Sequence, residues 1–146
     1  MTRVLVLHGP NLDLLGEREP EIYGRMTLAE LEAEITGWAV GLDLDVVHFQ
    51  SNHEGALIDR LHERDFDAAI VNAGGLTHTS VSLRDALLGI SRPFVEVHLS
   101  DPNAREPFRH VNFLADIAIE RIYGRGAEGY RLALEVLAKR FGDGAA

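Results

Sequence analysis

The sequence predicts one doubly wound α/β domain, in which helices cover both faces of a five-stranded parallel sheet. Short apolar runs rich in β-branched residues alternate along the chain with segments of helical periodicity. The length of 146 residues fits a single domain, residues 1–146, that is large enough to bury a core. No repeat, low-complexity tract or interdomain linker divides it.

Five apolar segments are expected to form the strands, because each is short and most are bounded by turn residues. Strands that alternate with helices are typical of a parallel sheet covered on both faces, and the crossovers between them are right-handed. With five strands, the flavodoxin-like order is the natural prediction. The expected strands are residues 3–7, 44–50, 66–72, 92–100 and 115–124.

Four segments have helical spacing, and each follows one of these strands or the loop after it. They are residues 27–40, 51–64, 80–90 and 127–141. Thr27 and Glu30 form a capping-box pattern at the start of the first helix. Ser51 or Asn52 is the expected cap of the second helix. The last residues, 142–146, resemble a frayed tail.

Composition excludes several classes of function. The net charge of −9 argues against a nucleic-acid-binding surface, since phosphate binding needs a basic excess. The chain has no cysteine, which removes disulfides and thiol nucleophiles and fits a cytoplasmic protein. No apolar run is long enough to span a membrane, and the N-terminal run is too short for a signal peptide. A small anionic ligand in a local basic pocket remains compatible with this composition.

Polar side chains gather where the expected strands end, which is where open α/β sheets bind ligands. His8 and Asn11 follow the first strand, and residues 51–53 follow the second. Residues 72–78 and 98–100 lie at the ends of the third and fourth. Four of the seven histidines therefore fall on one rim of the sheet. We expect the functional site there.

Two loops could cover this rim. The segment 8–24 contains two prolines and three glycines and has no periodicity, so a long loop is expected after the first strand. It carries Arg18 and Tyr23, while Arg105 and Arg109 lie on a second rim loop. Three arginines on two loops favour an anionic ligand.

Glu96 and His98 lie two residues apart on the fourth expected strand, so their side chains share one face. Two interpretations stay open. The pair can be a buried structural contact, or the carboxylate can fix the tautomer of a histidine that exchanges a proton on its other nitrogen.

Other motifs are weaker. The GRGAEG string at 124–129 is not a dinucleotide fingerprint, because no further strand with an acidic residue follows it. No H-E-x-x-H spacing is present, and although histidines on separate loops could converge on a metal, a metal-free site is expected. A serine hydrolase using Ser80 with His78 or His98 lacks the G-x-S-x-G elbow, and Ser80 is equally a helix cap.

Several long motifs then resemble one family, the type II 3-dehydroquinate dehydratases, over nearly the whole chain. The resemblance implies a flavodoxin-like fold, no metal or cofactor, and dehydration of 3-dehydroquinate to 3-dehydroshikimate through an enolate. The motifs are GPNLDLLGEREPEIYG, FQSNHEGALIDRLHE, NAGGLTHTSVSLRDAL, EVHLS, AREPFRH and GAEGYRLALE.

The resemblance also implies catalytic roles. Tyr23 matches the base that removes a proton from C2, and Arg18 matches the arginine beside it, a cation that would favour the ionised tyrosine. Asn11 corresponds to the residue that holds the enolate oxygen together with an ordered water. His98 matches the general acid that protonates the departing hydroxyl, and Glu96 would orient it.

The same resemblance assigns substrate-binding residues. Asn72 and His78 correspond to residues that bind the ring hydroxyls and neighbouring groups. The backbone amides of Leu99 and Ser100 correspond to the clamp on the substrate carboxylate, and Arg109 matches a further site arginine.

Assembly and pathway follow only from the family. Its members assemble from trimers into a dodecamer, and Asp85 matches an acidic residue that reaches a neighbouring subunit's site. Biosynthesis and quinate breakdown use the same step, so both roles fit. A non-catalytic module that binds a small anion, or a purely structural subunit, is the alternative class of function.

This chain departs from the family pattern at a few positions. His8 stands where asparagine is common, and Asp13 where asparagine or glycine is common. Residues 101–103 read Asp-Pro-Asn, and the last expected strand is more charged than usual. Asp13 is expected to point away from Tyr23 or to pair with an arginine. No expected catalytic side chain is missing.

Overall fold

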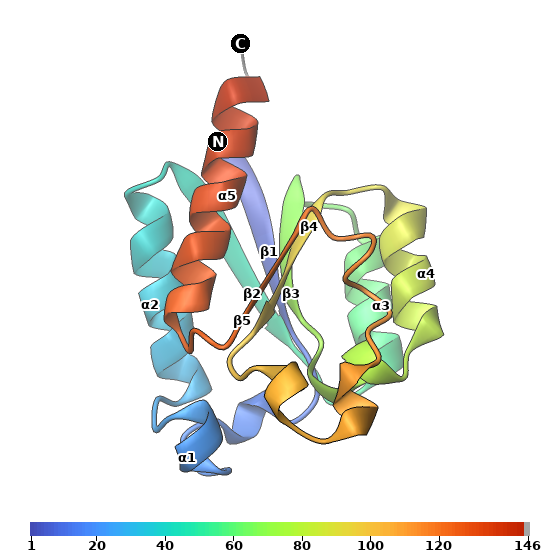
Figure 1. Ribbon diagram of the computed structural model, residues 1–146. Coiled ribbons are helices and arrows are strands. Elements are labelled where there is room, and N and C mark those ends of the chain that lie inside the picture. Colours follow the sequence, from blue (N-terminus) through green and yellow to red (C-terminus); the bar gives the residue numbers. More distant parts are fainter. Residues whose placement is uncertain (145–146) are drawn as a thin grey trace.

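A computed structural model, drawn as a ribbon in Figure 1, describes residues 1–144 of the chain. Five strands form one sheet, and every neighbouring pair is parallel. The order β2-β1-β3-β4-β5 confirms the predicted flavodoxin-like sheet. The strands are β1 (Thr2–His8), β2 (Leu44–Gln50), β3 (Ala68–Asn72), β4 (Phe94–His98) and β5 (Glu120–Tyr123).

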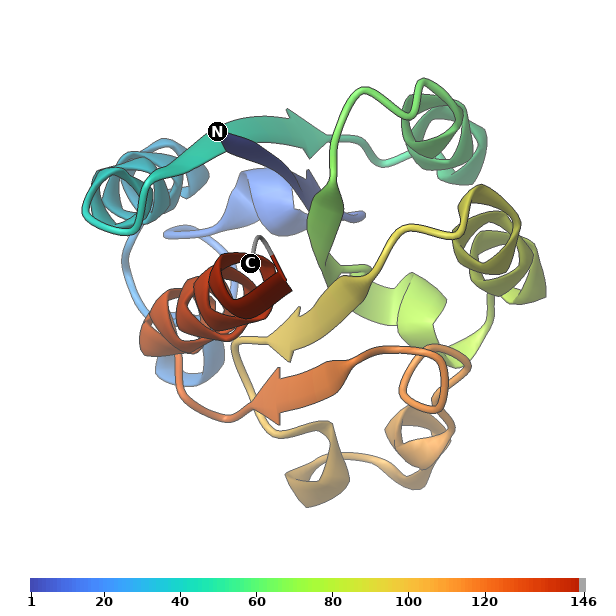
Figure 2. The same ribbon diagram turned by 90° about the horizontal axis from the view of Figure 1, so that it is seen from above.

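Helices cover both faces of this sheet, as predicted, and Figure 2 shows the two layers from above. Helices α2 and α5 pack on one face, and α3 and α4 pack on the other. The helices are α1 (Pro20–Tyr23), α2 (Leu28–Val40), α3 (Glu54–His62), α4 (Val81–Ile90) and α5 (Glu128–Gly144).

Alternation along the strands divides the core into two parts. On β1, Val4 and Val6 face the α2 and α5 layer, whereas Leu5 and Leu7 face α3 and α4. All four are buried. Because β1 is buried on both faces, its sequence is a continuous apolar run, as expected for a central parallel strand.

The helix starts test the capping predictions. The Thr27 hydroxyl accepts the Glu30 amide at 3.2 Å and the Glu30 carboxylate accepts the Thr27 amide at 3.1 Å, which confirms the capping box. Ser80 caps α4 by accepting the Leu83 amide at 2.8 Å, and its hydroxyl donates to the Glu54 carboxylate. The hydroxyl proton therefore goes to Glu54 and not to His78 or His98, so the predicted serine–histidine pairing has no support among the described contacts.

The predicted cap of the second long helix is wrong. Helix α3 begins at Glu54 with His53 at the cap position, and no side chain caps it. Ser51 accepts the His53 amide at 2.9 Å, while the Asn52 side chain accepts the Asn11 amide at 2.9 Å. Both candidate caps therefore serve the loops of the rim.

The last strand is much shorter than the predicted segment 115–124. The Asn112 side chain accepts the amides of Leu114 and Ala115, at 2.7 and 2.9 Å, and the Leu114 carbonyl then accepts from Ile117 and Ala118. These bonds form a turn, so the chain enters the sheet only at Glu120.

Other boundaries also differ from the sequence predictions. The predicted loop 8–24 contains a short 3-10 helix at Leu12–Leu14 and the single-turn helix α1, which begins at a proline. Segment 66–72 is a strand only from Ala68 to its end at Asn72, and segment 92–100 only in its central part, Phe94–His98. Helix α5 continues to Gly144, into the predicted frayed tail 142–146, because Phe141 still packs against the core. Residues 145–146 of that tail lie outside the described residues.

The carboxyl edge of β1 lies very close to the end of β3. A Cβ on Gly9 would lie 2.5 Å from the Ala73 carbonyl oxygen, which no side chain can tolerate without a backbone shift.

Among residues 1–144, no helix has the length and apolar character that crossing a membrane requires.

Candidate active site

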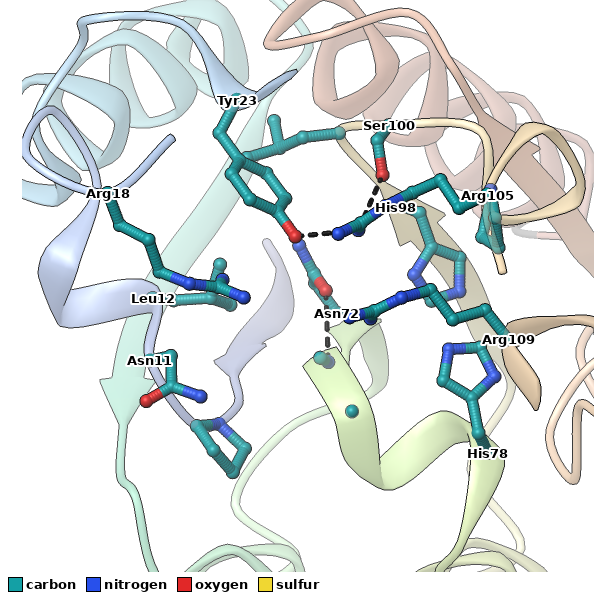
Figure 3. Close-up of a pocket in the computed structure, with 15 residues that line it drawn as sticks. Asn11, Leu12, Arg18, Tyr23, Asn72, His78, His98, Ser100, Arg105 and Arg109 are labelled. Carbon is teal, nitrogen blue, oxygen red and sulfur yellow. Dashed lines mark hydrogen bonds between the residues drawn. The ribbon is translucent and has the colours of Figure 1, made fainter. Parts of the chain in front are cut away.

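One pocket opens at the carboxyl edge of the sheet, as the sequence predicts (Figure 3). Its cavity volume is about 170 Å³. It collects residues from the loops after β1, β3 and β4. The residues that line it are Pro10, Asn11, Leu12, Arg18, Tyr23, Asn72, Gly74, Gly75, His78, His98, Leu99, Ser100, Pro102, Arg105 and Arg109.

Tyr23 ends helix α1 and lies between two guanidinium groups. Arg105 Nη1 donates to the Tyr23 hydroxyl oxygen at 2.7 Å, the contact drawn in Figure 3. The Arg18 guanidinium carbon lies 5.0 Å from the centre of the tyrosine ring, and that of Arg105 lies 5.4 Å from it. The Tyr23 hydroxyl oxygen therefore accepts a hydrogen bond from one cation, and its ring contacts two.

Sequence reasoning assigned the cation beside Tyr23 to Arg18 and treated Arg105 only as a rim arginine for an anion. In the structure Arg105 makes the hydrogen bond to the hydroxyl, while Arg18 contacts the ring. The two residues of that hydrogen bond lie 82 positions apart on different loops. No local spacing signals such a contact.

His98 and Glu96 share one face of β4, as predicted, and are directly bonded. His98 Nε2 lies 2.6 Å from the Glu96 carboxylate. The carboxylate is fully buried and the imidazole almost so. If Nε2 donates this bond, the carboxylate fixes the orientation of the ring and leaves Nδ1 as the nitrogen without this partner.

Two residues that the sequence analysis did not single out hold Glu96 in place. Asn112 Nδ2 donates to the same carboxylate oxygen at 2.7 Å, and Arg121 Nε lies 3.5 Å from the other oxygen. Arg121 is the register neighbour of Glu96 on β5. Only the strand order and register could have identified it, since the two residues are far apart in sequence. A paired and hydrogen-bonded carboxylate can remain charged in a buried position.

His78 lies at the end of the 3-10 helix Gly74–His78. Its Nδ1 lies 2.6 Å from the Val111 carbonyl oxygen, so Nδ1 carries the hydrogen and donates it. Burial lowers the pKa of His78, and the nearby His98 and Arg109 lower it further, although the Val111 bond opposes this. The neutral ring then offers Nε2 as an acceptor for a ligand hydroxyl.

Asn72 ends β3 and is nearly buried. Its Nδ2 donates to the Tyr130 hydroxyl at 3.0 Å and its Oδ1 accepts the Gly74 amide at 3.2 Å. Burial raises the pKa of Tyr130, so its hydroxyl stays protonated. One amide hydrogen of Asn72 remains available to the pocket.

The GRGAEG turn after β5 positions the loop that follows β4. The Gly124 amide donates to the Ser100 carbonyl at 3.0 Å, and the Gly126 amide donates to the Leu99 carbonyl at 3.1 Å. Both glycines have positive φ, of 73° and 55°. This motif therefore orients the Leu99 and Ser100 peptide units beside the pocket, in keeping with the sequence interpretation as a tight turn.

Nine of the eleven sequence-predicted site residues line the pocket, and two do not. Glu96 lies behind His98, and Asp85 lies exposed on α4. Arg109 reaches the pocket wall while its Nε donates to Glu106 at 2.8 Å. Asp13 is exposed and does not line the pocket, in line with the expectation that it points away from Tyr23.

Asn11 adopts a left-handed conformation with φ of 71°, which asparagine tolerates better than most residues. The Asn52 side chain accepts its amide, which joins the loops after β1 and β2. Asn11 therefore stays at the end of β1, opposite His98 and His78 across the pocket in Figure 3.

Fold and site together define a flavodoxin-like α/β protein whose pocket combines proton-transferring side chains with several guanidinium groups. That combination suits acid–base chemistry on a small anion.

Comparison with known proteins identifies the family. The Dehydroquinase class II family model matches residues 2–138. The chain is 52% identical to a 3-dehydroquinate dehydratase of Sodalis glossinidius over 94% of this chain and 93% of that protein. It is 51% identical to a catabolic 3-dehydroquinase of Pyricularia oryzae over 94% of this chain and 90% of that protein.

A solved structure agrees. The type II dehydroquinase of Butyrivibrio crossotus superposes with a TM-score of 0.91 at 38% identity, covering 93% of this chain and 97% of that one. The chain belongs to the class II dehydroquinase family. It is therefore an enzyme of this type, as the sequence predicts.

Proposed function

We propose that this protein dehydrates 3-dehydroquinate to 3-dehydroshikimate through an enolate, with Tyr23 as base and His98 as general acid. The observation that carries the proposal is the pairing of Tyr23 with Arg105 and of His98 with Glu96 around one pocket. A base supported by cations and an acid supported by a carboxylate are the two proton-transferring groups that this elimination needs.

The reaction begins when ionised Tyr23 removes a proton from C2 of the substrate. The electron pair moves toward the C3 ketone and forms an enolate. The side chain of Asn11, together with a water molecule, binds the enolate oxygen in this scheme. The proton taken from C2 makes Tyr23 a neutral hydroxyl, while Arg105, which bonds its oxygen, and Arg18, which contacts its ring, are the cations beside it throughout.

In the second step the enolate collapses and the C1 hydroxyl leaves. His98 protonates that hydroxyl, so it departs as water, and Glu96 stabilises the imidazolium before the transfer. The net change is loss of one water, with no oxidation or reduction. No step requires a cofactor, and we propose that the reaction is cofactor-independent.

The remaining pocket residues bind the substrate. We assign the substrate carboxylate to the amides of Leu99 and Ser100 together with Arg109, because all three residues line the pocket and charged and backbone donors suit an anion. His78 Nε2 accepts from a ring hydroxyl, and the free amide hydrogen of Asn72 donates to another.

We further propose a cytoplasmic homo-oligomer, a dodecamer built from trimers, in which the exposed Asp85 reaches a neighbouring subunit's site. A light-scattering mass close to twelve chains would support this assembly. A monomeric mass at assay concentration would contradict it.

The two curated relatives above include one named catabolic and are equally similar, so identity does not choose between a biosynthetic and a catabolic role.

The direct test of the reaction uses 3-dehydroquinate without added metal or nucleotide, and with a chelator present. We expect an ultraviolet absorbance from the conjugated enone product. Tyr23→Phe should nearly abolish turnover while it still binds the substrate, because it removes only the hydroxyl. No turnover by the wild type would refute the proposed reaction, and a wild-type rate in Tyr23→Phe would refute the role of Tyr23.

A second variant tests the acid. Glu96→Gln keeps the shape of the side chain but removes the charge that stabilises protonated His98, so kcat should fall. The alkaline limb of its pH profile, where a general acid loses its proton, should move to lower pH. A substrate analogue whose leaving group departs as a stable, weakly basic anion needs no general acid, so its turnover should be affected less. An unchanged pH profile of kcat would argue that Glu96 is only structural.

A further inference from the structure

Three potential metal ligands converge outside the pocket. His8 ends β1, His48 lies on β2, and Glu32 lies on α2, all on the face of the sheet that α2 and α5 cover. His8 Nε2 lies 3.2 Å from His48 Nδ1. The Glu32 carboxylate oxygen lies 3.8 Å from the first nitrogen and 3.7 Å from the second. None of the three residues lines the pocket.

The triangle formed by these atoms has the size of a metal coordination sphere. A point equidistant from three atoms at these separations lies about 2.1 Å from each, which matches zinc–nitrogen and zinc–oxygen distances. Two imidazole nitrogens and one carboxylate oxygen are also a donor set that zinc commonly uses.

The protonation of the cluster fits ligation. Burial lowers the pKa of His8 to about 3, and the neighbouring His48 adds to this, so the ring is neutral at physiological pH. His48 Nε2 lies 3.1 Å from the Thr36 hydroxyl, which can accept its hydrogen and leave Nδ1 with a lone pair. Such a partner on the far nitrogen is a usual feature of metal-bound histidine.

Glu32 makes no direct bond within the cluster. The distances from its carboxylate to the two imidazoles exceed hydrogen-bond length, which leaves room for an ion between the three groups. Glu32 is 30% exposed, so an ion can reach the cluster from solvent.

We propose that His8, His48 and Glu32 form a binding site for a divalent transition-metal ion, Zn²⁺ above all, separate from the substrate pocket. Water from the exposed side completes the coordination. The ion joins the carboxyl end of β1 to β2 and α2, and so steadies the start of the loop that carries Asn11. This role is structural and does not depend on the proposed reaction.

The test uses tag-free protein stripped with a chelator and then dialysed into chelator-free buffer. Titration with ZnCl₂ in a calorimeter should give one bound ion per chain. Zn²⁺ at about 100 times its Kd should raise the unfolding temperature by about 5–10 °C. Co²⁺ should give visible absorption bands of a low-coordinate site, which report ligands directly.

Glu32→Gln is the main variant, because its partly exposed side chain can change without loss of the fold. It should weaken Zn²⁺ binding at least about tenfold, since even residues beyond the ligands often contribute that much. His48→Gln should remove both the binding and the Co²⁺ bands. His62→Gln, an exposed histidine on α3, is the matched control and should bind like the wild type.

Circular dichroism at the start of each titration confirms that a variant is folded. Equal Zn²⁺ affinity in wild type, Glu32→Gln and His48→Gln would overturn the proposal. So would binding of less than one ion per two chains by the wild type, or equal loss of binding in His62→Gln.

Discussion

The buried His8 should make this protein acid-labile in a way that one substitution can remove. Its pKa lies near 3 in the folded chain and at the ordinary value of 6.5 when unfolded. Below pH 6.5 the unfolded chain therefore binds a proton that the folded chain does not. Stability contributed by this group is complete above pH 6.5 and is lost progressively as the pH falls toward 3.

The size of this effect follows from the two pKa values. By the linkage relation, proton binding to His8 in the unfolded state lowers the free energy of unfolding by about 2.5 kcal/mol between pH 7 and pH 4.5. Solvent screening does not reduce this much, because the His8 side chain has no exposed surface. His8→Asn cannot titrate and should lose this part of the pH dependence. It should also be less stable at pH 7, since the ring fills a buried position.

The assay is urea unfolding of both proteins at pH 7 and pH 4.5, at equal chain concentration and with a chelator present. The wild type should lose about 2.5 kcal/mol more than His8→Asn over that interval. His62→Gln, which removes an exposed histidine, should retain the wild-type loss. If His8→Asn lost as much stability as the wild type, His8 would not be the buried neutral group described here.

Three further substitutions test single contacts. Arg105→Ala should lower kcat about 10- to 100-fold, the worth of a charge-assisted hydrogen bond to Tyr23, and steady-state rates within twofold of wild type would contradict this. Gly9→Ala forces a Cβ against the Ala73 carbonyl and should lower the free energy of unfolding, measured in urea, by about 3 kcal/mol. A decrease of less than about 0.5 kcal/mol would show that the backbone there is free to move. Thr27→Ala removes the cap of α2 and should lower the free energy of unfolding by about 1 kcal/mol, which a shift of the urea midpoint would show. An unchanged midpoint would mean that water replaces the cap.

Periodicity predicted the sheet and the long helices well, because each central strand is buried on both faces and each helix has one apolar stripe. It also predicted that Glu96 and His98 would share a face, since alternation along a strand is a local property. The position of β5 was predicted less well, because a side chain, Asn112, takes up backbone amides that an isolated apolar run would offer to the sheet.

Contacts between loops were beyond local reasoning. The bond from Arg105 to Tyr23 depends on how two connections fold over the same edge. The cluster of His8 and His48 depends on the pairing of β1 with β2, which puts both rings on one face within reach of each other. The first arrangement depends on loop folding and the second on strand order and register, and neither leaves a spacing in the sequence.

The two proposed proton-transferring groups depend on different halves of the core. Tyr23 packs against the core beneath α2 and α5, and Asn72, which faces that side, bonds to Tyr130 of α5. The side chains of Glu96 and His98 point to the opposite face, in line with Phe94 of the α3 and α4 core. The pocket lies where β1 and β3 separate these faces, which is the point in a doubly wound sheet where successive connections leave on opposite sides. Tyr23 and His98 are therefore linked in two ways: through the sheet edge, where Gly9 lies against Ala73, and through Arg105, which lies on the loop after β4 and donates to the Tyr23 hydroxyl.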